Sequence, residues 1–431
     1  MSAAAPADLS AYDRLRWNAA ELEALFAGGQ HRRELLAYFG AHDFRRLTLL
    51  ARRAAAWPAP AARPRVYVIP GIMGSELGRT RPAPWPADLL WLDPLDIIGG
   101  RLIELDLDSG IPLEPLGVLP PTYAPLQLEL RAAGCDVVLH AYDWRRSILE
   151  TGRELGARLA ADPAEQIHVI AHSMGGLLAR VALASAPLAR VVRLITVGTP
   201  HAGTFAPLQA LRGTYPVVRR LAALDRRHDA ETLAANVFSS FPSLYEMLPT
   251  AASGCAVDVF EPGNWPQRGP APRAARLQAA RGFERALAPL DARCVAIVGV
   301  GQRTVTGAVR TGEEFAYAVT GAGDGTVPLR SAAPAGVRCH FFRSEHSDLL
   351  RSPTVARALI ELVRRGHTRV LPRATAPERH APVSVSDEEL RTLGASKVDW
   401  QALMPEARRL YLQQLNMPPP QYLRRAGRRR A

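Results

Sequence analysis

Three residue types that together activate a serine nucleophile stand in order along the chain. Ser173 lies in the segment 171–175 (Ala-His-Ser-Met-Gly), Asp324 lies in 323–328 (Gly-Asp-Gly-Thr-Val-Pro), and His346 follows. A serine hydroxyl attacks an ester efficiently when a histidine takes its proton and a carboxylate orients that histidine. In hydrolases whose serine stands between a strand and a helix, the order is serine, acid, histidine. We therefore predict Ser173 as nucleophile, Asp324 as acid and His346 as general base.

The segments around the serine are suited to hold it on a sharp turn. Residues 167–171 are mostly apolar and rich in β-branched side chains, which favours a strand, and 177–183 is typical of a helix. The residues two before and two after the serine, Ala171 and Gly175, are small, as the strained turn requires. The dipole of the following helix would favour negative charge that develops beside Ser173.

The acid and the base are expected on loops that follow strands. Residues 295–301 indicate a buried strand, and the glycines around Asp324 allow a tight turn after it. A further strand over 337–343 leads to His346, so the histidine falls just past a strand end. Loops at strand ends are where catalytic side chains usually lie.

Further motifs narrow the choice of family. They span residues 66–346 and comprise 66–77 (Val-Tyr-Val-Ile-Pro-Gly-Ile-Met-Gly-Ser-Glu-Leu), 142–145 (Tyr-Asp-Trp-Arg), the serine turn, 198–203 (Gly-Thr-Pro-His-Ala-Gly), and 323–328 with His346. In these motifs the chain resembles the lecithin:cholesterol acyltransferase family of α/β-hydrolases. The resemblance implies a mostly parallel central sheet with helices on both faces, and an enzyme that hydrolyses or transfers lipid acyl esters through an acyl-enzyme.

The resemblance also implies an oxyanion hole and a structural pair. The turn at 70–72 matches the family's oxyanion loop, so the backbone N–H groups of Ile72 and Met174 are expected to bind the carbonyl oxygen, each contributing roughly 3 kcal/mol in the transition state. Asp143 and Arg145 match a motif that we interpret as structural, and we expect them to pair near the serine turn.

Other polar residues have simpler explanations. His172 and His201 are interpreted as packing or loop-fixing residues, because the triad needs neither. His168 and His172 lie four apart on one predicted strand, too far apart for one metal ion. The alternating acidic residues of 104–108 resemble one face of a strand, and we expect them to be solvated rather than to bind calcium. We predict no metal and no cofactor.

Composition agrees with a single large α/β domain carrying insertions and tails. The chain has 431 residues, of which 48% are hydrophobic, enough for a large core. Its four cysteines lack paired spacing, which favours a reducing compartment. The first residues do not resemble a secretion signal, and no apolar stretch reaches about 18 residues. We therefore expect a cytoplasmic protein.

The chain is strongly basic, with a formal net charge of +12, and Lys397 is its only lysine. The simplest interpretation of so many arginines is the compositional bias of a GC-rich genome. Such a surface is also compatible with peripheral contact with an anionic membrane, at roughly 1 kcal/mol per basic residue. Nucleic acid is not expected, because the arginines are scattered and no nucleic-acid-binding module accompanies them.

The catalytic domain is expected over 61–372, with a helical N-terminal appendage over 1–60. Helical periodicity runs over 10–56, with Ser10 as a cap and a break at 28–29. An insertion at 204–292 is expected to form a lid. Its apolar side chains are expected to line an acyl pocket or to form the lid's own core: Phe205, Leu208, Phe238, Phe241, Leu244, Tyr245 and Leu248. Residues 78–125 form a second excursion that is expected to shape the entrance.

The C-terminal region, 373–431, is expected to be a linker over 373–385 and then a basic helical tail. Ser386 and Glu389 make a capping box at the start of that tail. Its arginine-rich end is either solvated or docks on an anionic membrane or partner.

Two functional classes remain open: a serine-dependent lipase, phospholipase or O-acyltransferase, and a catalytically silent hydrolase fold that serves as a binding or regulatory module. The complete triad favours the enzyme.

Overall fold

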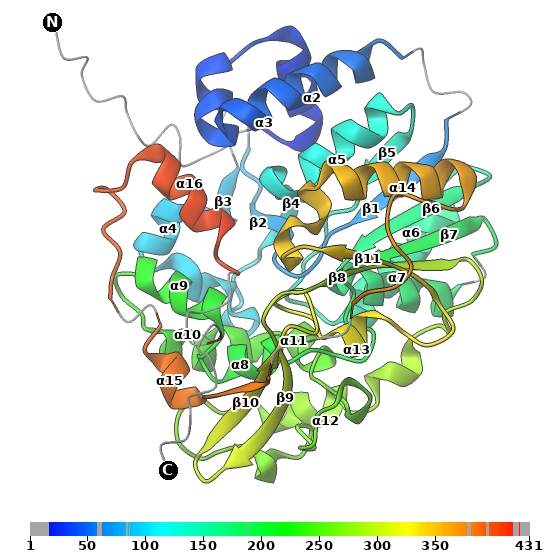
Figure 1. Cartoon of the computed structure of the whole chain (residues 1–431). Helices are drawn as coiled ribbons and strands as arrows, with labels where there is room; N and C mark the ends of the chain where they lie inside the picture. The colour runs from blue at the N-terminus through cyan, green and yellow to red at the C-terminus, as the bar shows by residue number, and fades with distance from the viewer. Residues whose placement is uncertain are drawn as a thin grey trace, which may run out of the picture.

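The computed structural model describes residues 17–57, 63–82, 85, 87–186, 188–376, 381–393, 396–416 and 422. A six-stranded, wholly parallel sheet forms its centre. The strand order is β11-β8-β7-β6-β1-β5 (Figure 1). The strands are β1 (Arg65–Ile69), β5 (Asp136–Leu139), β6 (Ile167–His172), β7 (Val191–Val197), β8 (Cys294–Val300) and β11 (Arg338–Arg343). The strands predicted at 167–171, 295–301 and 337–343 are thereby confirmed.

Helices cover both faces of this sheet, as Figure 1 shows. One face carries α5 (Pro120–Ala132) and α14 (Pro353–Arg365), and the other carries α6 (Ile148–Ala161) and α7 (Met174–Ser185). Alternation along β1 explains the two layers, because Val66 and Val68 pack with the first pair of helices while Tyr67 and Ile69 pack with the second. The fold is that of an α/β-hydrolase, as predicted.

A small antiparallel sheet, in the order β3-β2-β4, precedes α5. It consists of β2 (Ser75–Arg79), β3 (Asp88–Trp91) and β4 (Glu114–Val118), with α4 (Pro94–Ile98), η1 (Arg101–Leu105) and η2 (Leu107–Ser109) between β3 and β4. The strand suggested by the acidic alternation at 104–108 is therefore wrong. In the 3₁₀ turn η1, residues three apart eclipse each other, which brings Arg101 Nε within 2.6 Å of Glu104 Oε1. Asp108 pairs with Arg273, so these acids are bound to arginines rather than simply solvated.

The insertion predicted at 204–292 consists of short helices and turns. They are α8 (Ala206–Leu211), α9 (Pro216–Leu224), α10 (Ala230–Asn236), η3 (Phe238–Ser240), α11 (Pro242–Glu246), η4 (Ala251–Ser253), η5 (Pro262–Asn264), α12 (Ala274–Ala280) and η6 (Phe283–Ala286). After β8 come the hairpin β9 (Thr304–Thr311) and β10 (Glu314–Thr320), then α13 (Leu329–Ala332) and η7 (His346–Arg351). Helix α9 begins with Pro216 and α10 has Asp229 as its cap, which gives these helices defined starts.

The N-terminal helices α2 (Ala19–Gly28) and α3 (Arg32–Ala55) are separated where the break at 28–29 was predicted. Their apolar faces pack on Ala124 and Leu128 of α5, so they extend the core. Ser10 lies outside the described residues.

The C-terminal region is more firmly integrated than a linker and tail. The last part of the predicted linker forms β12 (Val383–Ser386), which pairs with β10, and the capping box is confirmed at the start of α15 (Asp387–Arg391). The buried Asp387 carboxylate lies 3.1 Å from Arg212 Nε and accepts a hydrogen bond from Tyr317 at 2.7 Å. Helix α16 (Pro405–Gln413) then packs against α3. The arginine-rich end at 424–430 lies outside the described residues.

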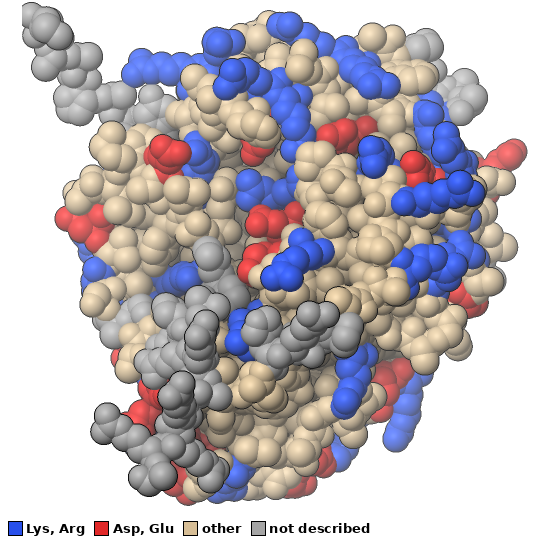
Figure 2. Space-filling view, viewed as in Figure 1, with Lys and Arg blue, Asp and Glu red and all other residues tan. Residues whose placement is uncertain are grey.

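Positive and negative side chains are intermixed on the face of the molecule shown in Figure 2. Lys and Arg side chains are distributed over much of it, with Asp and Glu side chains among them. In the part of the chain that the structure describes, no helix is long and apolar enough to span a membrane. The four cysteines form no disulfide.

Candidate active site

The turn that carries Ser173 is strained and tightly enclosed. Ser173 connects β6 to α7 with φ 52° and ψ −126°, a region that non-glycine residues enter at a cost of about 1–3 kcal/mol. A Cβ on Gly175 would lie 2.5 Å from the Pro70 carbonyl oxygen, and one on Gly71 would lie 2.8 Å from Ser173 Cβ. Side chains at either position would push the strand, the helix and the 70–72 turn apart, which explains the small residues there.

Asp324 and His346 are in direct contact. His346 Nδ1 lies 2.7 Å from Asp324 Oδ2, and the His346 backbone N–H donates to the Asp324 carbonyl at 2.8 Å. The other carboxylate oxygen of Asp324 accepts from the backbone N–H groups of Thr326 (3.0 Å) and Val327 (2.7 Å). Asp324 is fully buried, so its carboxylate is fixed on both sides. With Nδ1–H donating to Asp324, His346 Nε2 is left as the acceptor.

The predicted oxyanion loop is a tight turn held by four aromatic side chains. The Gly74 N–H donates to the Gly71 carbonyl at 3.0 Å, and Met73 adopts φ 60° inside the turn. Two contacts come from tyrosines: Tyr123 Oη accepts from the Gly71 N–H (3.0 Å), and Tyr142 Oη donates to the Pro70 carbonyl (2.8 Å). Two come from tryptophans: Trp91 Nε1 donates to the Met73 carbonyl (2.9 Å), and Trp144 Nε1 donates to the Ser75 carbonyl (3.0 Å). These contacts leave the loop little freedom to move.

The two predicted oxyanion donors are unpaired. Within the described residues, the backbone N–H of Ile72 has no acceptor. Met174 is the first residue of α7, where a backbone N–H has no acceptor within the helix. Both groups are therefore free to bind a ligand oxygen.

His172 contacts both His346 and the tyrosine that holds the loop. Its ring is tilted by 30° to that of His346, with centroids 5.0 Å apart, and its Nδ1 lies 3.1 Å from Tyr123 Oη. Burial, and next the nearby His346, lowers the pKa of His172 to about 3, so the ring is neutral near pH 7. The Tyr123 hydroxyl accepts from the Gly71 N–H and also forms a hydrogen bond with His172 Nδ1. Burial likewise lowers the pKa of His201 to about 3.

Tyr123 was missed by the sequence analysis. It lies on α5 in the middle of an apolar stretch and belongs to no recognised motif. The one available signal was its chemistry, because a tyrosine on a buried helix face needs a partner for its hydroxyl.

Ser173 and His346 line one mostly apolar cavity of about 250 Å³, and Asp324 lies behind His346. The walls come from distant parts of the chain: the oxyanion loop, β3 with Leu89 and Trp91, α9 with Val217, and the two terminal regions through α3 and α16. The volume is near the lower end of the range for small-molecule sites. Residues of the 78–125 excursion are thus part of the wall, and so are residues of the C-terminal region.

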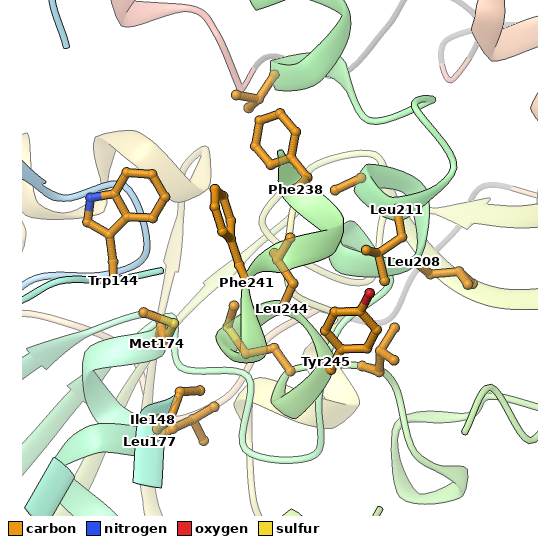
Figure 3. Packing of buried hydrophobic residues seen from close by; sticks show 14 of the residues in the cluster. Trp144, Ile148, Met174, Leu177, Leu208, Leu211, Phe238, Phe241, Leu244 and Tyr245 are labelled. Carbon is orange, nitrogen blue, oxygen red and sulfur yellow. The ribbon is translucent and has the colours of Figure 1, made fainter. Parts of the chain in front are cut away.

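The 204–292 insertion lines the cavity, through residues that include Ala210, Tyr215 and Val217, but mostly not through the side chains named from the sequence. Those side chains belong to the buried core, which was the alternative expected for them. Of the insertion's seven predicted side chains, Leu244 alone lines the cavity. Figure 3 shows Phe238 and Phe241 beside each other near Trp144, and the ring centroids lie 5.6 Å apart in both the Phe238–Phe241 and Phe241–Trp144 pairs. The short helices must bury one face each to be stable, and these large side chains serve that packing.

Asp143 and Arg145 form the predicted structural pair. The guanidinium contacts both carboxylate oxygens, at 2.9 Å and 2.7 Å, and its Nη1 donates to the Leu105 carbonyl at 3.0 Å. Both side chains are buried, so the pair fixes the loop that carries Trp144.

Among the residues described, no three His, Cys, Asp or Glu side chains are grouped so that they could hold a metal ion.

A match to one family model supports the fold class, and two solved structures show a distant likeness to this chain. A family model described as a PGAP1-like alpha/beta domain matches residues 144–247, which include the Ser173 turn. The mature form of Bacillus licheniformis lipase BlEst2 is 13% identical over 72% of this chain and 94% of its own, with a TM-score of 0.37. A chain of the Tle4–Tli4 complex is 14% identical over 70% of this chain and 98% of its own, with a TM-score of 0.46. Among curated proteins, none matches the chain significantly.

Proposed function

We propose that the protein is a serine-dependent hydrolase of lipid acyl esters, with Ser173 as nucleophile, His346 as general base and Asp324 as the acid that orients it. One observation carries the proposal: the strained Ser173 and the Asp324-bound His346 line the same mostly apolar cavity. A structural Ser-x-Gly turn requires neither a histidine in its cavity nor a buried carboxylate behind that histidine.

The chemistry follows from these positions. His346 Nε2 takes the proton from the Ser173 hydroxyl as Oγ attacks the ester carbonyl carbon. The backbone N–H groups of Ile72 and Met174 stabilise the oxyanion, and Asp324 stabilises the imidazolium. Collapse of the tetrahedral intermediate breaks the bond to the alcohol, which leaves with the proton from His346. Water activated by the same histidine then releases the fatty acid and restores the enzyme.

The apolar walls favour a substrate with an acyl chain, since each buried methylene contributes about 0.8 kcal/mol to binding. The resemblance to the lecithin:cholesterol acyltransferase family supports a lipid ester as the donor. It also extends the proposal to transfer, in which an alcohol replaces water in the second step. Analysis of products formed with and without an added alcohol distinguishes hydrolysis from transfer.

The experiment compares turnover of a p-nitrophenyl ester series by the wild type, Ser173→Ala, His346→Ala and the double variant. Each single variant should lose nearly all activity, and the double variant should lose no more, because the two residues act as one unit. Ser109→Ala, which removes an exposed serine from η2, is the matched control and should behave as wild type. A folded wild type that turns over no ester would favour the silent binding module.

A further inference from the structure

A second polar position lies in the same cavity and is not used by the triad. Glu76 on β2 and Tyr38 on α3 both line the cavity, and they come from segments far apart in the sequence. Within the described residues, neither the Glu76 carboxyl nor the Tyr38 hydroxyl has a hydrogen-bond or ion-pair partner. The nearby wall from β3, with Leu89 and Trp91, is apolar.

An unpaired carboxyl in such surroundings is costly, and the rest of the protein avoids it. Glu246 is similarly buried, but its two oxygens accept from the Ser147 hydroxyl and the Ile148 N–H, each at 2.6 Å. Glu76 has no equivalent donors. Burial alone raises the pKa of Glu76 to about 8, and burial, followed by Glu76 itself, raises the pKa of Tyr38.

Three arginines line the cavity, and none of them pairs with Glu76. Arg408 donates to the Leu403 carbonyl at 3.0 Å and to the Gln401 carbonyl at 3.3 Å. Arg409 donates to the Ala37 carbonyl at 3.2 Å and lies 3.4 Å from Glu406. Arg351 pairs with Asp43 and Asp348, at 3.6 Å and 3.3 Å. These cations are thus held by other partners, and no side chain of the described residues supplies the donor that Glu76 lacks.

Glu76 is also close enough to the reacting centre to contact the same ligand. It follows Ile72 by four residues, so the two lie within about 14 Å even if the chain is fully extended. On the neighbouring strand β4, a Cβ on Gly117 would lie 3.1 Å from Glu76 Oε2, so the glycine there leaves the carboxyl room. An ester whose carbonyl is bound at Ile72 can therefore place a group several bonds away beside Glu76.

We propose that Glu76 and Tyr38 form a polar subsite that binds a hydrogen-bond donor of the substrate, a hydroxyl or a protonated amine carried by the alcohol part of the ester. Ligand sites commonly combine apolar walls with a few polar groups that fix orientation. The inference rests on the proposed function and refines it, because it selects esters of polar alcohols over esters of plain alkanols.

The test uses two pairs of butyrate esters matched in shape. Glycerol 1-butyrate is compared with 2-methylbutyl butyrate, which lacks the two hydroxyls, and 2-(dimethylamino)ethyl butyrate is compared with 3-methylbutyl butyrate, which lacks the amine. The measured quantity is the ratio of kcat/KM within each pair. Glu76→Gln keeps an acceptor but removes the charge, and Glu76→Leu removes both. Glu114→Gln, an exposed position on β4, is the control.

We expect the wild type to prefer the polar member of at least one pair. Glu76→Leu should reduce that preference by about 10- to 100-fold at a pH above 8, where the Glu76 carboxyl is ionised, as expected for a hydrogen bond to a charged group. If the donor is an amine, Glu76→Gln should reduce it similarly; if it is a hydroxyl, Glu76→Gln should retain most of it. Tyr38→Phe should cause a smaller loss, and the control should match the wild type.

Two results separate this inference from the proposed function. Ester turnover with ratios that Glu76→Leu leaves unchanged in both pairs would overturn the polar subsite while the hydrolase proposal stands. If the wild type turns over no ester, calorimetry with 1-O-butylglycerol and 2-(dimethylamino)ethyl butyl ether reads the subsite directly. Binding of either ether that Glu76→Leu abolishes would support it, and binding of neither, or equal binding by both proteins, would overturn it.

Discussion

The substitution Tyr123→Phe removes one hydroxyl and should impair the proposed oxyanion hole indirectly, through the loop that carries Ile72. Tyr123 Oη accepts from the Gly71 N–H at 3.0 Å and contacts His172 Nδ1 at 3.1 Å, and Gly71 directly precedes the proposed donor Ile72. Phenylalanine fills the same space without the acceptor. The Gly71 N–H would then be buried without a partner, and the loop would shift to find one.

The magnitude follows from these contacts. Leaving one buried backbone N–H unsatisfied costs about 1–3 kcal/mol. Complete loss of an oxyanion donor lowers kcat by about 10²–10³, which is the upper limit for a shift of Ile72. We therefore expect kcat about 10- to 100-fold below wild type with KM nearly unchanged, because an oxyanion donor acts mainly in the transition state.

Steady-state kinetics on a short soluble ester measures the loss of kcat, and urea unfolding measures the loss of stability. Tyr142→Phe is the matched control, since the Tyr142 hydroxyl donates to the Pro70 carbonyl of the same loop, so that its removal takes no acceptor away from a backbone N–H. It should reduce kcat clearly less than Tyr123→Phe does. A Tyr123→Phe enzyme with wild-type kcat, or one in which only KM rises, would refute a positioning role for Tyr123.

Three further predictions concern the acid, the C-terminal region and the acyl site. Asp324→Asn should lower kcat by about 10⁴, because the wrong histidine tautomer is then favoured, and a loss below tenfold in the ester assay would exclude Asp324 as the acid. Asp387→Asn should lower the free energy of unfolding by about 3–5 kcal/mol, since it breaks a buried ion pair, whereas Glu388→Gln at the exposed neighbouring position should change it little; equal urea midpoints would contradict this. Leu89→Ala should reduce turnover of long-chain esters more than of acetates. Phe238→Ala should cost about 3–5 kcal/mol of stability without altering chain-length preference, and the reverse pattern would place the acyl chain beside Phe238.

The sheet and the order of the proposed catalytic residues could be predicted because both leave local signals. Strands that are buried on both faces appear in the sequence as runs of apolar, β-branched residues. The turn at Ser173 requires small residues two positions before and two positions after the serine. The capping box at Ser386 is equally local.

The cavity walls could not be predicted, because they depend on packing between distant segments. Leu89 and Val217 belong to different elements, and nothing in their local patterns distinguishes them from Phe238, which packs in the core instead. The ion pair between Arg212 and Asp387 joins residues 175 positions apart, so the C-terminal region looked like a tail in the sequence. Local periodicity reports the face that an element buries, but not the element that covers it.

Peptide mapping after reaction with a fluorophosphonate tests the assignment of Ser173 most directly, because the probe bonds only to an activated serine and requires no knowledge of the substrate. We expect one adduct, on the peptide that contains Ser173, and no adduct in His346→Ala. An unlabelled wild type, or an adduct on a different serine that persists in Ser173→Ala, would contradict the proposed mechanism.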